Sequence, residues 1–240
     1  LCISYTNFMK TILKISLLIS LFVCSIGTIN AQYPKKRITS DIHVGLNLAG
    51  MDIKNENTYK QAKVGVHIGF NVNYKFWSNM QLQSGLFVTK KGLKRHIHTV
   101  ERNGDISVTT YDEYYNATGN YIQMPFNLGY ELYFTKSWAF NINGGLYLAY
   151  GYKGTGTTSS VTVISDNIGK PVITTVPESE FESFTPERWR RFDYGLNAKV
   201  GLVYDIYTIN IGYEYGLYNI AYIGPELRNR NFFVSFGFRF

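Results

Sequence analysis

Cysteine is almost absent from this sequence of 240 residues, since only Cys2 and Cys24 occur. Both lie within residues 1–31, so the rest of the chain has no thiol, no disulfide and no cysteine-based metal site. One apolar run without charge occurs, at 15–26, and it is shorter than the roughly 20 residues that a membrane-spanning helix needs. The sequence therefore gives no basis for a helical membrane protein or a disulfide scaffold.

Clustered positive charge is also lacking. The formal net charge is +7, but Lys and Arg are scattered along the chain. They form no basic stripe of the kind that binds nucleic acid, so we expect no nucleic-acid partner. No internal stretch keeps a helical period, which leaves strands as the main predicted element.

The first 31 residues have the order of a secretory signal peptide. Two lysines precede the apolar run at 15–26, and Ala31 supplies a small residue before the expected cleavage site. The alternatives are a buried helix or a lipoprotein signal at Cys24, although Val23 stands where that signal needs a small residue.

We therefore predict a signal peptide at 1–31 and one domain at 32–240. Residues 1–8 lie upstream of Met9, the expected start of translation. The predicted product is exported through a cleaved signal.

Eight segments alternate between large apolar residues and small or polar ones. In Val64–Phe76 the even positions are Val, Ile, Phe and Tyr, whereas the odd positions are Gly, His, Asn and Lys. Period-two alternation predicts strands with two unlike faces. The eight segments are 41–50, 64–76, 80–92, 121–134, 138–152, 192–204, 207–216 and 231–240.

The composition of the two faces predicts which one meets lipid. The small-or-polar face is mostly Gly and Asn, which suits a crowded barrel interior better than a water-exposed sheet. The apolar face is rich in Tyr and Phe near strand ends, as in the aromatic girdles of membrane barrels. The alternative is a secreted, lipocalin-like barrel with its apolar face inward around a lipid.

The connections alternate between short and long. Tight turns are expected at 77–79, 135–137 and 205–206. Long excursions are expected at 51–63, 93–120, 153–191 and 217–230. This asymmetry is typical of outer-membrane barrels, with short periplasmic turns and long extracellular loops. We predict an all-β fold, a closed antiparallel eight-stranded transmembrane β-barrel. Pro125 should then lie at a bulge or near a strand end, because proline cannot donate to the ladder.

Charged and imidazole side chains fall on the predicted inward face. We expect Glu131 and Glu214 to pair with Lys199 or Arg239 in a plug-like network, because charges in a narrow interior must pair or meet water. The predicted interior polar network comprises His43, His67, Lys75, Glu131, Asp193, Lys199, Glu214 and Arg239.

Few residues suggest catalysis or metal binding. His96 and His98 share a strand face but lack a nearby third ligand, so they are interpreted as surface histidines. An enzyme would need a nucleophile, a base and an orienting group that converge, and the serine- and threonine-rich segment 155–160 has no histidine in its half of the chain. We predict no catalytic residue, no metal site and no cofactor.

The longest excursion has two distinct parts. Segments 155–163 and 172–176 are rich in Thr and Val and could form a hairpin above the membrane. Segment 186–191 mixes Arg with Trp, which suits either a contact surface or a solvated lid near lipopolysaccharide phosphate.

Several stretches together resemble a known family, the Bacteroidetes outer-membrane β-barrel or "porin family" of PorT-type small barrels. They are MQLQSGLFVTKKG, YIQMPFNLGYEL, GGLYLAYGYKG, RRFDYGLNAKVGLVY, YEYGLYNIA and NRNFFVSFGFRF. The resemblance implies an eight-stranded barrel in the outer membrane. It also implies that Phe236, Phe238 and Phe240 form the assembly signal that the barrel assembly machinery reads.

Function follows only coarsely from this resemblance. Some members belong to type IX secretion and gliding, so we expect a structural or interaction anchor in an envelope or secretion assembly. The expected partners are outer-membrane lipid, lipopolysaccharide, the barrel assembly machinery and envelope or secretion proteins. A small-solute porin or ligand-uptake barrel is the alternative, although eight strands leave no open lumen.

Overall fold

The computed structural model describes residues 36–53, 59–77, 79–103, 107–166 and 171–240. The predicted signal peptide, 1–31, lies outside the described residues. Within them, no helix is long and apolar enough to cross a membrane. The strands are β1 (Ile38–Ile53), β2 (Tyr59–Gln61), β3 (Lys63–Trp77), β4 (Met80–Asn103), β5 (Ser107–Tyr133), β6 (Trp138–Asp166), β7 (Val172–Glu182), β8 (Phe192–Tyr204), β9 (Tyr207–Gly216) and β10 (Leu227–Arg239).

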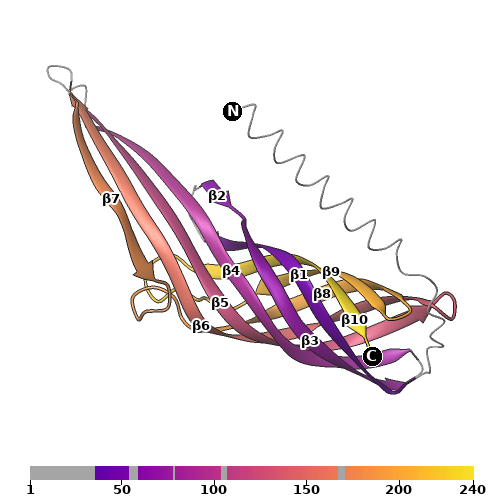
Figure 1. Ribbon diagram of the computed structural model, residues 1–240. Helices are drawn as coiled ribbons and strands as arrows, with labels where there is room; N and C mark the ends of the chain where they lie inside the picture. Colours follow the sequence, from indigo (N-terminus) through magenta and orange to yellow (C-terminus); the bar gives the residue numbers. More distant parts are fainter. Residues whose placement is uncertain (1–35, 54–58, 78, 104–106, 167–170) are drawn as a thin grey trace, which may run out of the picture. The chain divides into compact units, whose positions relative to one another are not determined.

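Eight of the ten described strands form a closed antiparallel ring (Figure 1). The order around it is β1, β3, β4, β5, β6, β8, β9 and β10, and β10 pairs with β1 to close it. The seam is in register from Asp41, opposite Arg239, to Ile53, opposite Leu227. Closure satisfies every strand edge inside the bilayer, where an unpaired backbone group is costly. The predicted eight-stranded β-barrel is confirmed.

The apolar side chains face outward. Leu196 and Ile211 are 47% and 44% exposed, whereas Asn210 is 4% exposed. The same alternation runs through the other ring strands, so an outward apolar band surrounds a small and polar interior. This orientation contradicts the lipocalin-like alternative, which requires an apolar interior.

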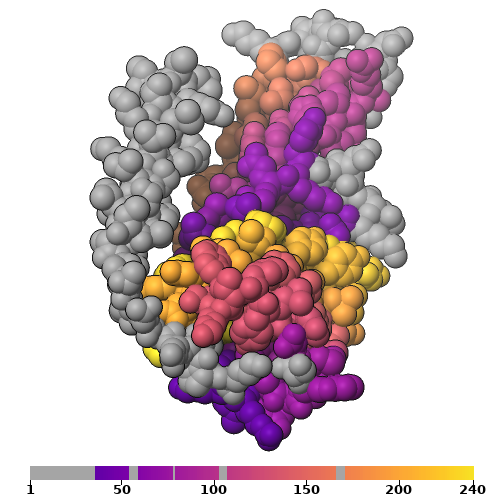
Figure 2. All heavy atoms as spheres, turned by 90° about the vertical axis from the view of Figure 1, so that its right-hand side faces the viewer, coloured from indigo at the N-terminus to yellow at the C-terminus, as the bar shows by residue number. Residues whose placement is uncertain are grey.

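Three short turns lie at one end of the barrel, and Figure 2 looks onto this end, with the β5–β6 turn in front. The two-residue connection between β8 and β9 places Asp205 at a φ of 56°. Tight hairpin turns require such positive φ values, which Asp tolerates better than most residues.

The expected loops at 93–120 and 153–191 are largely strands, and this corrects the sequence prediction. β4 continues to Asn103, and β5 starts at Ser107 opposite it, so the two strands stay paired beyond the apolar band. Figure 1 shows β4, β5, β6 and β7 rising together away from the short turns. We call this sheet, made of β2, β7 and the distal parts of β4, β5 and β6, the extension. Its Thr, Val and Tyr residues favour strands even when polar.

The hairpin predicted in segment 153–191 is confirmed. Val161 pairs with Thr175 and Ile164 with Val172, which joins β6 to β7. β7 lies off the ring and pairs with β6.

Pro125 lies inside β5, opposite Tyr147 of β6, and not near a strand end as expected. The register of β5 with β4 is continuous from Met80 to Ser84 and resumes at Phe87, which faces Gln123. The pairing with β4 is therefore interrupted beside the proline, which has no N–H to donate.

Candidate functional site

A cluster of paired charges fills the interior at the short-turn end. Arg239 donates from Nε to Asp41 Oδ1 at 2.6 Å and also pairs with Glu131. The Lys75 ammonium lies 2.7 Å from Glu131 Oε2, and Tyr133 donates to the same oxygen at 3.0 Å. β1, β3, β5 and β10 each supply a charged residue, so the cluster ties together strands that are distant in sequence.

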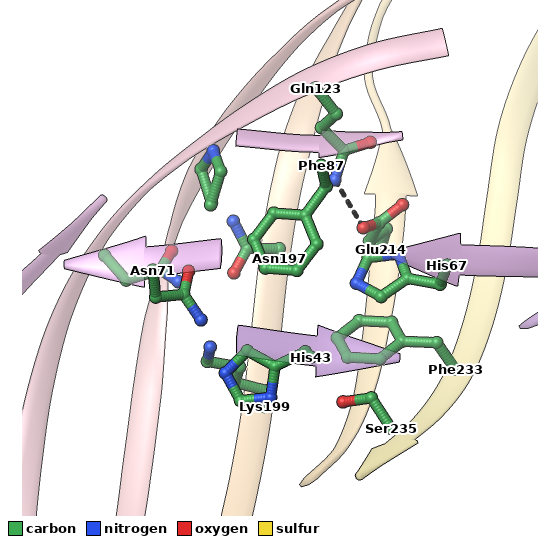
Figure 3. Close-up of a pocket in the computed structure, with 12 residues that line it drawn as sticks. His43, His67, Asn71, Phe87, Gln123, Asn197, Lys199, Glu214, Phe233 and Ser235 are labelled. Carbon is green, nitrogen blue, oxygen red and sulfur yellow. Dashed lines mark hydrogen bonds between the residues drawn. The ribbon is translucent and has the colours of Figure 1, made fainter. Parts of the chain in front are cut away.

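Above this cluster, His67 is sandwiched between two phenyl rings (Figure 3). Its ring centroid lies 4.6 Å from those of both Phe87 and Phe233, with interplanar angles of 18°. Glycine makes room for this layer, because a Cβ on Gly212 would lie 2.3 Å from Phe233 Cζ. The three rings are buried at 6% exposure or less, so the stack lies inside the barrel.

A small cavity of about 20 Å³ adjoins the stack. Lys199 and Asn71 line it with His43 and His67, as Figure 3 shows. Both side-chain polar atoms of Asn71 are buried without a protein partner. A volume of this size holds about one water molecule, so the cavity is suited to a bound water and not to a solute path.

A second charge cluster lies nearer the extension. The Lys91 ammonium is 3.1 Å from Glu214 and 3.6 Å from Asp193, and it lies 4.2 Å from the ring centroid of Tyr147. Gln123 donates to Glu214 at 2.5 Å, the bond drawn in Figure 3. Lys91 is 1% exposed, so this cation is held entirely by protein groups.

Neutral donors also contact both carboxylates. Asn231 donates to Glu214 at 3.0 Å. Tyr147 and Asn229 donate to Asp193 at 3.1 Å and 2.9 Å. These donors offset part of the cost of burying the charges in a low-dielectric interior, although Asp193 Oδ1 itself accepts no hydrogen bond.

An apolar cluster closes the end of the barrel next to the extension. Trp189, Phe184 and Ile220 are at most 6% exposed and pack with Leu93 and Met51. Trp189 was interpreted as part of an exposed contact segment or lid at 186–191, and its burial corrects that prediction. Its backbone N–H donates to the Ser183 carbonyl at 3.0 Å, which holds the segment folded inward.

The interior polar residues lie where the alternation places them. Lys75 is half-buried, and the remaining seven are buried at 9% exposure or less: His43, His67, Glu131, Asp193, Lys199, Glu214 and Arg239. Glu131 pairs with Arg239, one of its two expected partners. Glu214 pairs with Lys91, so its expected pairing with Lys199 or Arg239 is wrong. Among the described residues, no salt bridge to Lys199 is formed.

The sequence analysis missed several interior residues, among them Asp41, Lys91, Phe87 and Phe233. The alternation in the sequence could have identified two of them, because Asp41 and Lys91 share the odd-numbered, inward face of their strands with His43 and Thr89. With them, the interior holds, among the residues that the structure describes, four cations (Lys75, Lys91, Lys199, Arg239) and four carboxylates (Asp41, Glu131, Asp193, Glu214).

The three phenylalanines of the predicted assembly signal lie on the outward side of β10 or directly after it. Phe238 and Phe240 are 36% and 64% exposed, and Phe236 is half-buried. Tyr207 of β9 lies beside Phe236, with ring centroids 6.0 Å apart. The row therefore forms part of the outward aromatic surface at the short-turn end.

His96 and His98 lie in the extension, and both contact Asp112. His96 Nε2 and His98 Nδ1 lie 2.9 Å and 2.8 Å from Asp112 Oδ1. Hydrogen bonds with His98 and His96 lower the pKa of the Asp112 carboxyl below its usual 3.8. In the part of the chain that the structure describes, no group of three or more His, Cys, Asp or Glu side chains could hold a metal ion.

Solved structures with a similar fold are outer-membrane proteins of low sequence identity. The attachment invasion locus protein Ail of Yersinia pestis, in complex with the heparin analogue sucrose octasulfate, is 13% identical, with a TM-score of 0.34 over 85% of this chain and 100% of that chain. OprG of Pseudomonas aeruginosa is 10% identical, with a TM-score of 0.42 over 88% of this chain and 99% of that chain. Neisserial surface protein A is 11% identical, with a TM-score of 0.34 over 83% of this chain and 95% of that chain.

Similarity at this level carries no information on function. A search of curated protein sequences returns no significant match. The sequence profile of the outer membrane protein beta-barrel domain, in contrast, matches residues 30–222. Together with the closed ring of eight strands and its outward apolar band, this match shows that the chain belongs to the outer membrane protein beta-barrel domain family.

Proposed function

We propose that the protein is a non-conducting anchor in the outer membrane that presents its extension to partners in the cell envelope. The observation that supports this function most directly is the filled lumen. From the short-turn end it contains the Arg239 cluster, the His67 stack, the Lys91 cluster and the apolar cluster around Trp189.

The charge balance of the interior supports the same proposal. Four cations face four carboxylates, and each carboxylate contacts a cation within 4.0 Å. A solute path needs groups that remain free to exchange partners with a passing ligand. Here all four carboxylates and three of the four cations, Lys75, Lys91 and Arg239, are engaged with one another, as in a packed core.

Conductance in planar bilayers tests the sealed lumen. We expect the purified protein to leave the baseline current unchanged over hours, whereas a trimeric porin inserted under the same conditions gives steps. A Trp189→Ala/Phe184→Ala variant shows whether the apolar cluster contributes to the seal. Steady, large single-channel steps from the unmodified protein would establish the porin alternative and refute the anchor.

The resemblance to PorT-type barrels suggests the kind of partner. We propose that the protein is part of an envelope or type IX secretion-related assembly and contacts its other components. A photo-reactive amino acid at Tyr111 or Val176, which are exposed on the extension, should capture envelope proteins in living cells. The same group at Leu196, within the lipid-facing band, serves as the control. Adducts with lipid alone from all three positions would contradict an interaction role.

Export through a cleaved signal peptide is part of the proposal. We expect amino-terminal sequencing of protein from the outer-membrane fraction to begin at Gln32. A chain that retains residues 15–26 would show that this segment is not removed.

A further inference from the structure

A groove of about 620 Å³ crosses the extension. It is built from cross-strand neighbours, since Tyr59 pairs with His96 and His96 with Tyr114, while Gln61 pairs with Lys94 and Lys94 with Asn116. These six residues come from β2, β4 and β5, and β6 and β7 provide the far side. The volume is within the usual range for small-molecule sites, about 300–1,000 Å³.

The groove lies on the same side of the wall as the lipid-facing residues. On β4, Val88 is exposed in the apolar band, and Lys90, Lys94 and His96 follow on the same face at even-numbered positions. Successive side chains of a strand alternate between its faces, so these residues continue the outward face above the hydrocarbon. We therefore expect the headgroup layer of the outer leaflet to lie against this surface.

The cations beside the groove are suited to phosphate. The Lys63 ammonium donates to Asn116 Oδ1 at 2.6 Å, which brings Lys63 next to Lys94 across the sheet. Among the described residues, neither Lys63, Lys90 nor Lys94 forms a salt bridge. Lysine ammonium groups bind phosphate through charge-assisted hydrogen bonds, so these lysines favour an anion.

The aromatic residues of the groove are suited to a sugar ring. His96 and Tyr114 are stacked with ring centroids 4.3 Å apart and an interplanar angle of 4°. Tyr59 is 80% exposed and Tyr114 51% exposed, so their rings are accessible to a ligand. Aromatic faces with polar tips pack against the apolar face of a ring while bonding its hydroxyls. Asn116 and Glu178, which also line the groove, provide hydrogen-bond acceptors for those hydroxyls.

We propose that this groove binds the phosphorylated sugar headgroup of lipopolysaccharide in the outer leaflet. Lys94 and Lys63 hold the phosphate, and the Tyr59, His96 and Tyr114 rings pack against the sugar. Bound headgroup would fix β2 against the extension and orient the sheet above the membrane. The inference is independent of whether the lumen conducts.

Binding to the refolded protein in detergent tests the proposal by native mass spectrometry and calorimetry. The probes are rough lipopolysaccharide, the same lipopolysaccharide after chemical dephosphorylation, and soluble glucosamine phosphate. We expect dephosphorylation to weaken binding at least about tenfold, and the Lys94→Gln/Tyr114→Ala variant to weaken it similarly, as the loss of one charge-assisted contact implies. The soluble sugar should bind more weakly than the lipid, because it lacks the membrane-facing part.

Lys136→Gln is the matched control, because it removes one exposed lysine from the turn at the opposite end of the barrel. It should leave affinity unchanged. Equal loss in this control would mean non-specific charge attraction and would overturn the site. So would binding that is insensitive to dephosphorylation or to the double variant. Equal affinity for the soluble sugar would overturn the assignment to the lipid. If the double variant fails to refold, Lys94→Gln alone provides the same comparison.

Discussion

Arg239 at the end of β10 donates to Asp41 near the start of β1 at 2.6 Å, across the seam that closes the barrel. The two residues are 2% exposed, and Arg239 also pairs with Glu131 on the opposite wall. One guanidinium therefore bridges two carboxylates and links β10 to β1 and β5. Similar links recur higher in the lumen, and they make the interior sensitive to single substitutions.

Replacing Arg239 with alanine should strongly destabilise the barrel. Two buried carboxylates would lose their shared cation, and breaking a buried pair in this way costs about 3–5 kcal/mol. The free energy of unfolding by urea in lipid vesicles measures the loss. Arg228→Ala is the control, since its pair with Glu226 is 38% exposed on both sides and is worth about 0–1 kcal/mol. Equal effects of the two substitutions would contradict the importance of the seam network.

Lys91 should contribute far more to stability than Lys199. Lys91→Met leaves Asp193 and Glu214 without their cation, at a cost of about 3–5 kcal/mol. Lys199→Met removes a buried cation that forms no salt bridge among the described residues, so we expect a change below about 1 kcal/mol. The same unfolding experiment compares the two variants. A larger destabilisation by Lys199→Met would show that the pairing of Lys91 with Asp193 and Glu214 does not stabilise the barrel.

Gly212 should not tolerate a side chain. A Cβ at this position would lie 2.3 Å from Phe233 Cζ, and overpacking of this kind costs about 1–3 kcal/mol. Gly212→Ala should therefore lower the urea midpoint and the fraction of heat-modifiable barrel on gels. Gly50→Ala meets nothing within 4 Å and should change stability by less than about 0.5 kcal/mol. Unchanged stability of Gly212→Ala would mean that the His67 stack is loosely packed.

Acid should weaken the contact between the two histidines and Asp112. The pKa of Asp112 is lowered below 3.8 by His98 and His96, so the folded state favours the ionised carboxylate. The contribution is fully present above pH 3.8 and is lost as the pH falls through the lower pKa of the folded state. Carbon-13 NMR of labelled aspartate should show this pKa rise toward 3.8 in His96→Ala/His98→Ala, with Thr99→Ala as control. No rise in the double variant would refute the contact.

Phe240 should matter for assembly in cells and not for the stability of the assembled barrel. Its side chain is 64% exposed, so its loss removes little internal packing. Phe240→Ala should refold in detergent as well as the unmodified protein but accumulate less in the outer-membrane fraction. Val234→Ala, on the same outward face and 42% exposed, is the control. Parallel losses in refolding and in cells would contradict a role as assembly signal.

The period-two pattern was sufficient to predict the ring strands and the direction of their faces. It placed Glu131 and Arg239 inside because parity along a strand is a local property. It could not identify Lys91 as the partner of Glu214, because that contact depends on how strands tilt and face one another across the lumen. The Lys199 prediction failed for this reason.

The strands of the extension also could not be predicted from the local sequence. The distal parts of β4, β5 and β6 are rich in Thr, Ser, Tyr and charged residues, a composition that also occurs in exposed loops. These segments form strands because each is hydrogen-bonded to an adjacent strand. His98 of β4 pairs with Asp112 of β5, and Thr110 of β5 pairs with Val163 of β6. The aromatic plug residue Trp189 was misassigned in the same way, since its burial depends on strands far away in the chain.

The eight strands of the ring each have two neighbours in the ring, so the barrel has no free strand edge. The extension is an open sheet, and β7 has a single described neighbour, β6. Its outer border carries Pro177, Glu178, Glu180 and Glu182, all exposed. Prolines and repeated like charges hinder a second chain from adding to such a border. We therefore expect these residues to hinder edge-to-edge pairing between the extensions of neighbouring copies. The barrel avoids such pairing because its sheet is closed, whereas the extension avoids it through the repulsion between its glutamates.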